Sequence, residues 1–155
     1  MDKTSFDELY KMYSLRTTED YSKYTKEETK EIFKSYLLSA IARFQTCYED
    51  KGREVNELLE TISPALTLTE KDITVELMCL TFLEGEVSSI TSLGAVLTTN
   101  DYKIVSGSQS LSEKESMVSN KKAYVDKLMA EYGTRINLKE MNKKKNDRIS
   151  QRGYY

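Results

Sequence analysis

Apolar residues recur three and four positions apart in two long stretches of the chain, as expected for helices with one buried face. The first stretch follows Thr25, and its apolar positions are Ile32, Phe33, Tyr36, Leu37, Ala40, Ile41, Phe44, Cys47 and Tyr48. The second stretch follows Thr69, and its main positions are Ile73, Leu77, Leu80, Leu83, Val87, Ile90 and Leu93. Val75, Met78, Cys79 and Phe82 widen the second stripe, so we expect that helix to be central.

Polar residues before these stretches predict where the helices begin. A Ser or Thr followed three positions later by Glu is typical of a capping box, which satisfies two backbone N–H groups at the start of a helix. The segment Thr25–Glu28 fits this pattern, and Ser5–Glu8 predicts a short N-terminal helix. Thr69–Asp72 is a third candidate, with Asp in place of the preferred Glu. Gly94 is the predicted end of the central helix.

The last third of the chain predicts one more helix and then a change of character. Heptad spacing predicts a helix from about Ser110, with apolar positions at Leu111, Val118, Val125 and Tyr132. Gly133 is a typical residue just beyond a helix end. Few apolar residues follow Ile136. We therefore expect an extended C-terminal arm over residues 134–155.

Residues 53–68 are ambiguous, since Val55, Leu58, Leu59 and Ile62 would fit a short helix ended by Pro64. The chain has only six Gly and one Pro, which favours helices over a fold with many turns. We predict an all-α fold. It is a small bundle of three principal helices plus a short N-terminal helix, forming a helical body over residues 1–133.

Charge is unevenly distributed between this body and the arm. The whole chain of 155 residues has 23 basic and 25 acidic residues, a net charge of −2. Residues 134–155 contain seven basic and two acidic residues, a net charge of +5, and the body therefore has a net charge of −7. An acidic body with a basic arm is the first indication of function.

The side chains most used in catalysis and metal binding are scarce. Histidine is absent, which removes the commonest general base and the commonest metal ligand. Cys47 and Cys79 stand far apart in apolar helical stretches, and we expect both to be buried and reduced. Phosphate-binding loops and nucleophile motifs are not found. We predict no catalytic residue, no cofactor and no metal site, and hence no enzyme.

The basic arm has three open interpretations. It is a disordered, solubilising terminus, a segment that becomes ordered on a protein partner, or a nucleic-acid contact. The terminal tyrosines favour a protein partner, because aromatic anchors are enriched at interfaces. The candidate binding residues of the arm are Lys143, Lys144, Lys145, Arg148, Arg152, Tyr154 and Tyr155.

The region from Thr25 to Tyr132 resembles the head–tail connector (adaptor or neck) proteins of tailed bacteriophages. The pattern starts at Thr69-Glu70-Lys71-Asp72-Ile73, continues through Glu76-Leu77-Met78-x-Leu80-x-Phe82-Leu83 and Val87-x-x-Ile90, and includes Leu97, Asp101, Tyr102 and Lys103. It ends on Leu128-Met129-Ala130-Glu131-Tyr132, and upstream Leu37-Leu38-Ser39-Ala40-Ile41-x-x-Phe44 also fits. The chain departs from the pattern at Gly85 and over residues 49–68.

The resemblance implies a structural protein of the virion. Proteins of this family form homo-oligomeric rings, typically dodecamers, that dock on the portal protein and receive the next neck or tail component. DNA would pass through the lumen without sequence-specific binding, and the arm would contact the portal. A small helical module that binds nucleic acid through its basic tail is the alternative.

The expected location follows from the same interpretation and from the absence of long apolar runs. The N-terminal residues lack the apolar stretch of a signal peptide, and no stretch is long enough to suggest a membrane contact. We expect assembly in the host cytoplasm and a final location in the neck of the virion.

Overall fold

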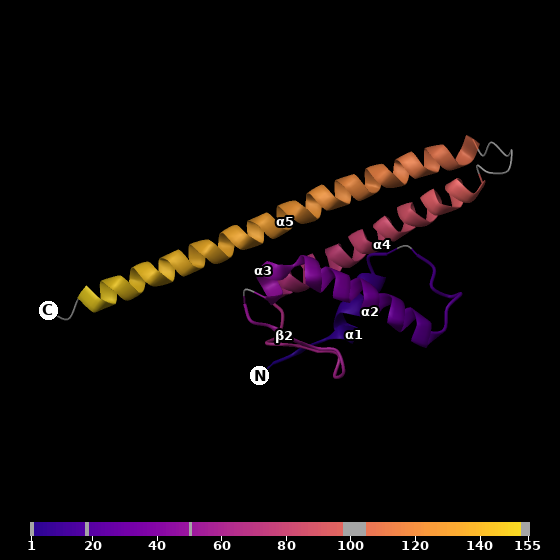
Figure 1. Ribbon diagram of the computed structural model, residues 1–155. Coiled ribbons are helices and arrows are strands. Elements are labelled where there is room, and N and C mark those ends of the chain that lie inside the picture. The colour runs from indigo at the N-terminus through magenta and orange to yellow at the C-terminus, as the bar shows by residue number, and fades with distance from the viewer. Residues whose placement is uncertain (1, 18, 50, 98–104, 153–155) are drawn as a thin grey trace.

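The computed structural model describes residues 2–17, 19–49, 51–97 and 105–152, and the side chains of these residues other than 92–97, 105–110 and 147–152. It is predominantly helical, with a small three-stranded antiparallel sheet (Figure 1). The helices are α1 (Phe6–Ser14), α2 (Lys26–Arg43), α3 (Gln45–Tyr48), α4 (Leu68–Leu97) and α5 (Val105–Arg152). The strands are β1 (Thr4–Ser5), β2 (Glu54–Asn56) and β3 (Thr61–Ser63), in the spatial order β1-β3-β2. The three principal helices and the short N-terminal helix are confirmed as α2, α4, α5 and α1.

The sheet is where the prediction of a purely helical fold is wrong. The segment 53–68 holds the hairpin formed by β2 and β3, and the N-terminal strand β1 pairs with the other side of β3. Ile62 is the register partner of both Thr4 and Val55, and it is fully buried. The helix-like apolar spacing misled because Ile62 is buried by a strand almost sixty positions away, which no local pattern contains.

Two of the three predicted helix starts are confirmed. Thr25 Oγ1 accepts a hydrogen bond from the Glu28 backbone N–H (3.2 Å), and the Glu28 carboxylate accepts one from the Thr25 N–H (2.8 Å). Ser5 Oγ likewise accepts from the Glu8 N–H at 3.3 Å. The helix after Thr25 is shorter than predicted, because Phe44 leaves the helical region (φ −101°, ψ 51°) and separates α2 from the single turn of α3.

The cap of α4 lies two residues before the predicted one. Thr67 Oγ1 accepts a hydrogen bond from the Glu70 N–H (3.4 Å), and the Thr67 N–H donates to the Glu70 carboxylate (2.7 Å). This pair has the preferred Glu at its third position, which Thr69–Asp72 lacks. The predicted end at Gly94 is also wrong, because α4 continues to Leu97. Glycine inside a helix costs only about 1 kcal/mol.

The hydrophobic core lies where α1, α2 and α4 meet, and α5 covers it from one side. Tyr13 of α1 packs edge-on against Phe33 of α2, with 5.0 Å between ring centroids. From α5, Val125 is fully buried and Tyr132 is buried to 7% exposure. The predicted burial of both cysteines is confirmed, and both are free thiols.

The C-terminal arm is helical and not extended, which corrects the predicted conformation. α5 continues without a break through Gly133 to Arg152, and its 48 residues span about 70 Å. Gly133 does not take the positive φ of a helix-ending glycine, since Gly52 is the glycine with positive φ among the described residues. Figure 1 shows the C-terminal half of α5 projecting beyond the other elements. Asp101, Tyr102 and Lys103 of the connector-like pattern lie outside the described residues.

Candidate interaction site

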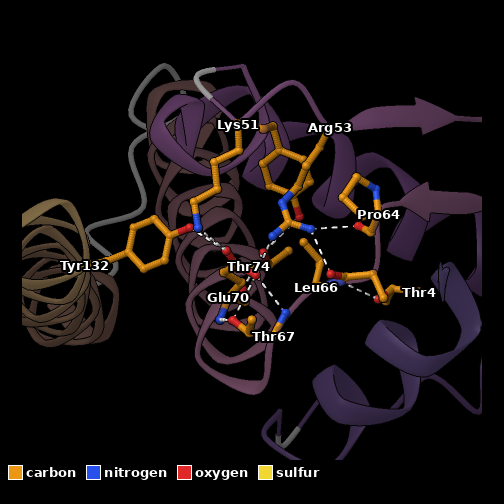
Figure 2. Close-up of polar contacts among 11 residues, drawn as sticks. Thr4, Lys51, Arg53, Pro64, Leu66, Thr67, Glu70, Thr74 and Tyr132 are labelled. Carbon is orange, nitrogen blue, oxygen red and sulfur yellow. Dashed lines mark hydrogen bonds and ion pairs between the residues drawn. The ribbon is translucent and has the colours of Figure 1, made fainter. Parts of the chain in front are cut away.

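A buried carboxylate, Glu70, connects α5 to the rest of the body. Its side chain has no exposed surface and accepts hydrogen bonds from four side chains on different parts of the chain (Figure 2). Lys51 Nζ lies 2.9 Å and Arg53 Nη2 lies 2.7 Å from its oxygens. The Thr67 hydroxyl donates at 2.8 Å, and the Tyr132 hydroxyl, from α5, donates at 2.5 Å. Glu70 thus holds α4, the segment before the hairpin and α5 together.

The Arg53 guanidinium extends this network to the chain that follows the hairpin. Its Nη1 donates to the carbonyl oxygens of Pro64 (2.7 Å) and Ala65 (2.9 Å), while Nη2 pairs with Glu70. The side chain of Arg53 is only 6% exposed. A buried guanidinium needs a counterion, and the Arg53–Glu70 pair thereby links α4 to the chain on both sides of the hairpin.

The electrostatics of Glu70 follow from these partners. Burial alone would raise the pKa of its carboxyl group, because the charged form loses its water. Hydrogen bonds from Tyr132, Thr67 and Lys51 together outweigh that effect and lower the pKa to about 2. The carboxylate is therefore ionised throughout the physiological range.

Acidification should weaken the fold through this group. A depressed carboxyl pKa adds stability that is fully present above the ordinary glutamate value of 4.5 and is lost as the pH falls toward about 2. We expect the difference in free energy of unfolding between the wild type and Glu70→Gln to be constant above about pH 5 and to shrink between pH 4.5 and 2. Urea titrations at several pH values measure it. A difference that stays constant down to pH 2 would contradict the low pKa.

Tyr132 is the last strong contact between α5 and the body. Its ring packs edge-on against Phe44 with 5.0 Å between centroids, and Lys51 Nζ lies 4.9 Å from its centroid. Burial and the adjacent Glu70 carboxylate raise the pKa of the Tyr132 hydroxyl, so it remains a hydrogen-bond donor. Ile136 still packs partly against the core, whereas every residue from Asn137 to Asn146 is exposed.

The predicted binding residues lie on this exposed end of α5 as far as the structure describes them. Lys143, Lys144 and Lys145 are exposed on consecutive positions and therefore point to different sides of the helix. Arg148 and Arg152 belong to the helical backbone, and nothing is described of their side chains. Tyr154 and Tyr155 lie outside the described residues. Hence the lysines form no single patch.

The same helix carries an exposed apolar pair that the sequence analysis did not identify. Leu138 is 54% and Met141 is 66% exposed, and their spacing of three puts them on one side of α5. Lys139 and Lys143, four apart, lie on roughly the opposite side. The spacing of Leu138 and Met141, three positions apart in the sequence, would have been enough to predict that they share one side of a helix. The exposed end of α5 therefore presents lysines on several sides and an apolar pair on one of them.

Other kinds of site find little support in the described part of the chain. Within residues 2–17, 19–49, 51–97 and 105–152, no group of three or more acidic or cysteine side chains is placed to hold a metal ion. Across the same ranges, no helix combines the length and the apolar character that crossing a membrane requires.

Known proteins do not identify this arrangement. Comparisons with models of protein families, with curated proteins and with solved structures found no match to the chain.

Proposed function

We propose that the protein is a ring-forming head–tail connector of a bacteriophage virion, with a structural and not a catalytic role. In this role it docks on the portal protein, extends the DNA channel and receives the next neck or tail component. The observation that carries the proposal is the exposed, basic end of α5, which projects beyond the last body contact at Ile136 (Figure 1). The apolar spacing that resembles the connector family also supports it.

A preformed helix is well suited to bind a large partner. Its backbone is already ordered, so docking costs less conformational entropy than docking of a disordered tail. Lysines on several sides would steer the helix toward an acidic surface, and Leu138 with Met141 would provide the apolar contact. We propose the portal as that partner.

The acidic body fits a channel through which DNA must slide. Residues 1–133 have a net charge of −7, and like charge weakens binding to phosphates. A ring of such bodies would guide DNA without holding it. The basic residues of α5 would then serve a protein contact outside the lumen.

Binding of nucleic acid through α5 is the competing function. It is favoured by one observation, the exposure of Lys139, Lys143, Lys144 and Lys145 along one helix. Such binding would depend steeply on salt, because each phosphate contact releases counterions. Portal binding that includes the apolar pair would depend on salt less.

Reversing charges on the arm tests the proposal. We expect the triple variant Lys143→Glu, Lys144→Glu and Lys145→Glu to weaken binding to the portal of the same virus by about tenfold or more. The reason is that opposite charge repels the acidic surface that the wild type is proposed to meet. Biolayer interferometry measures the affinity, and negative-stain images show whether rings form on the portal.

The matched control moves the same charge to the body. Lys3, Lys26 and Lys122 are exposed, and the triple change to Glu at these positions should leave portal binding within about twofold of the wild type. A wild-type chain that remains monomeric and unbound in the presence of the portal would refute the connector role. Tight, steeply salt-dependent binding to a random DNA duplex would support the alternative.

A further inference from the structure

A cleft of about 240 Å³ lies at the base of the exposed end of α5, between the start of α4 and the α5 face that begins at Tyr132. Figure 2 shows Lys51 and Tyr132 reaching Glu70 from two sides. Glu70 has no exposed surface, so it lies at the floor of the cleft. Arg135 and Lys139 are exposed and line its outer part. The cleft is therefore open to a ligand where α5 leaves the body.

The charges at the floor of the cleft do not cancel. Lys51 Nζ (2.9 Å) and Arg53 Nη2 (2.7 Å) both pair with the Glu70 carboxylate, so two positive charges meet one negative charge. The Lys51 side chain is 35% exposed and lines the cleft, so it can contact a ligand as well as Glu70. The floor thus keeps one positive charge in excess.

Arg135 and Lys139 add two positive charges at the rim. They are four positions apart, which places them on the same side of α5. Both are exposed, and neither forms an ion pair with any side chain that the structure describes. Glu140 is the acidic residue of the rim. Three basic side chains from two separate segments therefore surround the cleft, against one exposed carboxylate.

The basic rim continues along the exposed end of α5. Lys143 is exposed and stands four positions beyond Lys139, so Arg135, Lys139 and Lys143 form one row along the helix. Residues 134–146 contain five basic residues and one acidic residue, a net charge of +4. Members of the row are about 6 Å apart. Alternate side chains of an extended chain are about 6.6 Å apart, so such a chain can match the row.

We propose that the cleft binds a carboxylate from an extended acidic segment of the protein partner, and that the row Arg135, Lys139 and Lys143 binds further acidic residues of the same segment. This inference rests on the proposed function and names the chemistry of the surface that the exposed end of α5 meets. The Arg135 guanidinium can bind a carboxylate through two parallel hydrogen bonds, which favours that group over a simple anion.

The lining of the cleft favours a protein carboxylate over a nucleic acid. Sites for single-stranded nucleic acid combine basic residues with aromatic rings on which bases stack. Tyr132, the aromatic residue that lines the cleft, is only 7% exposed and packs against Phe44. Its ring is therefore not free to stack on a base.

Binding of a blocked, fluorescein-labelled hexaglutamate peptide to the full-length protein tests the site. The double variant Arg135→Gln and Lys139→Gln should weaken binding about tenfold or more, measured by fluorescence anisotropy at fixed ionic strength. The control is Lys122→Gln with Lys127→Gln, which removes the same charge from exposed positions of α5 outside the cleft and should stay within about twofold of the wild type. Equal weakening by the two double variants would show only general attraction to positive charge and would overturn the inference.

The acidic rim residue provides a test in the opposite direction. Glu140→Gln should strengthen peptide binding about twofold or more, because it removes the carboxylate that repels the ligand. Glu113→Gln, at an exposed position of α5 outside the cleft, should bind as the wild type does. An equal gain in both variants would contradict a site at the cleft.

Two further outcomes separate this inference from its competitors. A thymidine hexanucleotide that binds through Arg135 and Lys139 more tightly than the peptide would overturn the choice of a protein carboxylate. If the Arg135→Gln and Lys139→Gln variant binds the peptide and the portal as the wild type does, the cleft is wrong and the connector role stands. If the wild type binds the peptide at the cleft but forms no rings on the portal, the connector role fails and the carboxylate site stands.

Discussion

Replacing Glu70 with glutamine is expected to lower the free energy of unfolding by about 3–5 kcal/mol. The amide keeps the size of the side chain but removes its negative charge. Arg53, only 6% exposed, would then be buried without a counterion, and Lys51 would lose its partner. The hydrogen bond from Tyr132 would also weaken, because a charged acceptor is the stronger one. Urea denaturation followed by circular dichroism measures the change.

Glu57→Gln is the matched control for this experiment. Glu57 is 58% exposed, and its carboxylate lies 3.9 Å from Lys34. Exposed ion pairs contribute little, so this variant should stay within about 0.5 kcal/mol of the wild type. Equal stabilities for the two variants would show that the Glu70 network does not hold the body together.

Truncating Phe44 to alanine is expected to cost about 3–5 kcal/mol. Phe44 is 1% exposed and lies where α2 gives way to α3. Its ring packs edge-on against Tyr132 of α5 and Tyr48 of α3, with 5.0 Å and 6.2 Å between ring centroids. Its removal therefore leaves a cavity between two aromatic rings. Thermal and urea unfolding report the loss, and hydrogen exchange should show faster exchange of the α5 amides near Tyr132.

The control here is a truncation on the surface. Leu15 is 86% exposed at the end of α1, and Leu15→Ala should change the free energy of unfolding by less than about 0.5 kcal/mol. A Phe44→Ala variant as stable as Leu15→Ala would mean that the surrounding rings close the cavity at no cost.

The helices could be predicted because their signals are local. The capping pair Thr25 and Glu28 and the buried positions Phe33 and Leu37 all lie within a few turns of one another. A short segment therefore contains both the start of a helix and its buried face. The same reasoning placed Val125 and Tyr132 on one face of α5, where both are buried.

The hairpin could not be predicted because it is stabilised by a segment far away in the sequence. The helical arm could not be predicted because its helix continues past a glycine that is typical of a helix end. Ile62 is buried by pairing with Thr4, a contact that apolar spacing does not encode. Gly133 looked like an end, but no proline follows and nothing else interrupts the helix, so the modest cost of a glycine was not enough to stop it. Both errors arose where the local signal was weak.

One part of the Glu70 network could have been predicted from the sequence, whereas the other part could not. Thr67 and Glu70 form a better capping pair than Thr69 and Asp72, and the sequence contains that fact. The convergence of Arg53 and Tyr132 on the same carboxylate joins residues up to 79 positions apart, and only the folded chain shows it.

Because α5 is continuous, any change in its tilt near Tyr132 is transmitted to its C-terminal end. The helix extends from there to Arg152, a distance of about 30 Å. A tilt of about 10° at Tyr132 would displace Arg152 by about 5 Å, close to the rise of one helical turn. In a rotationally symmetric assembly, α5 would have to leave the body at the same angle in every copy. The buried hydrogen bond between Tyr132 and Glu70 would then determine the direction of the exposed end of α5 in each copy.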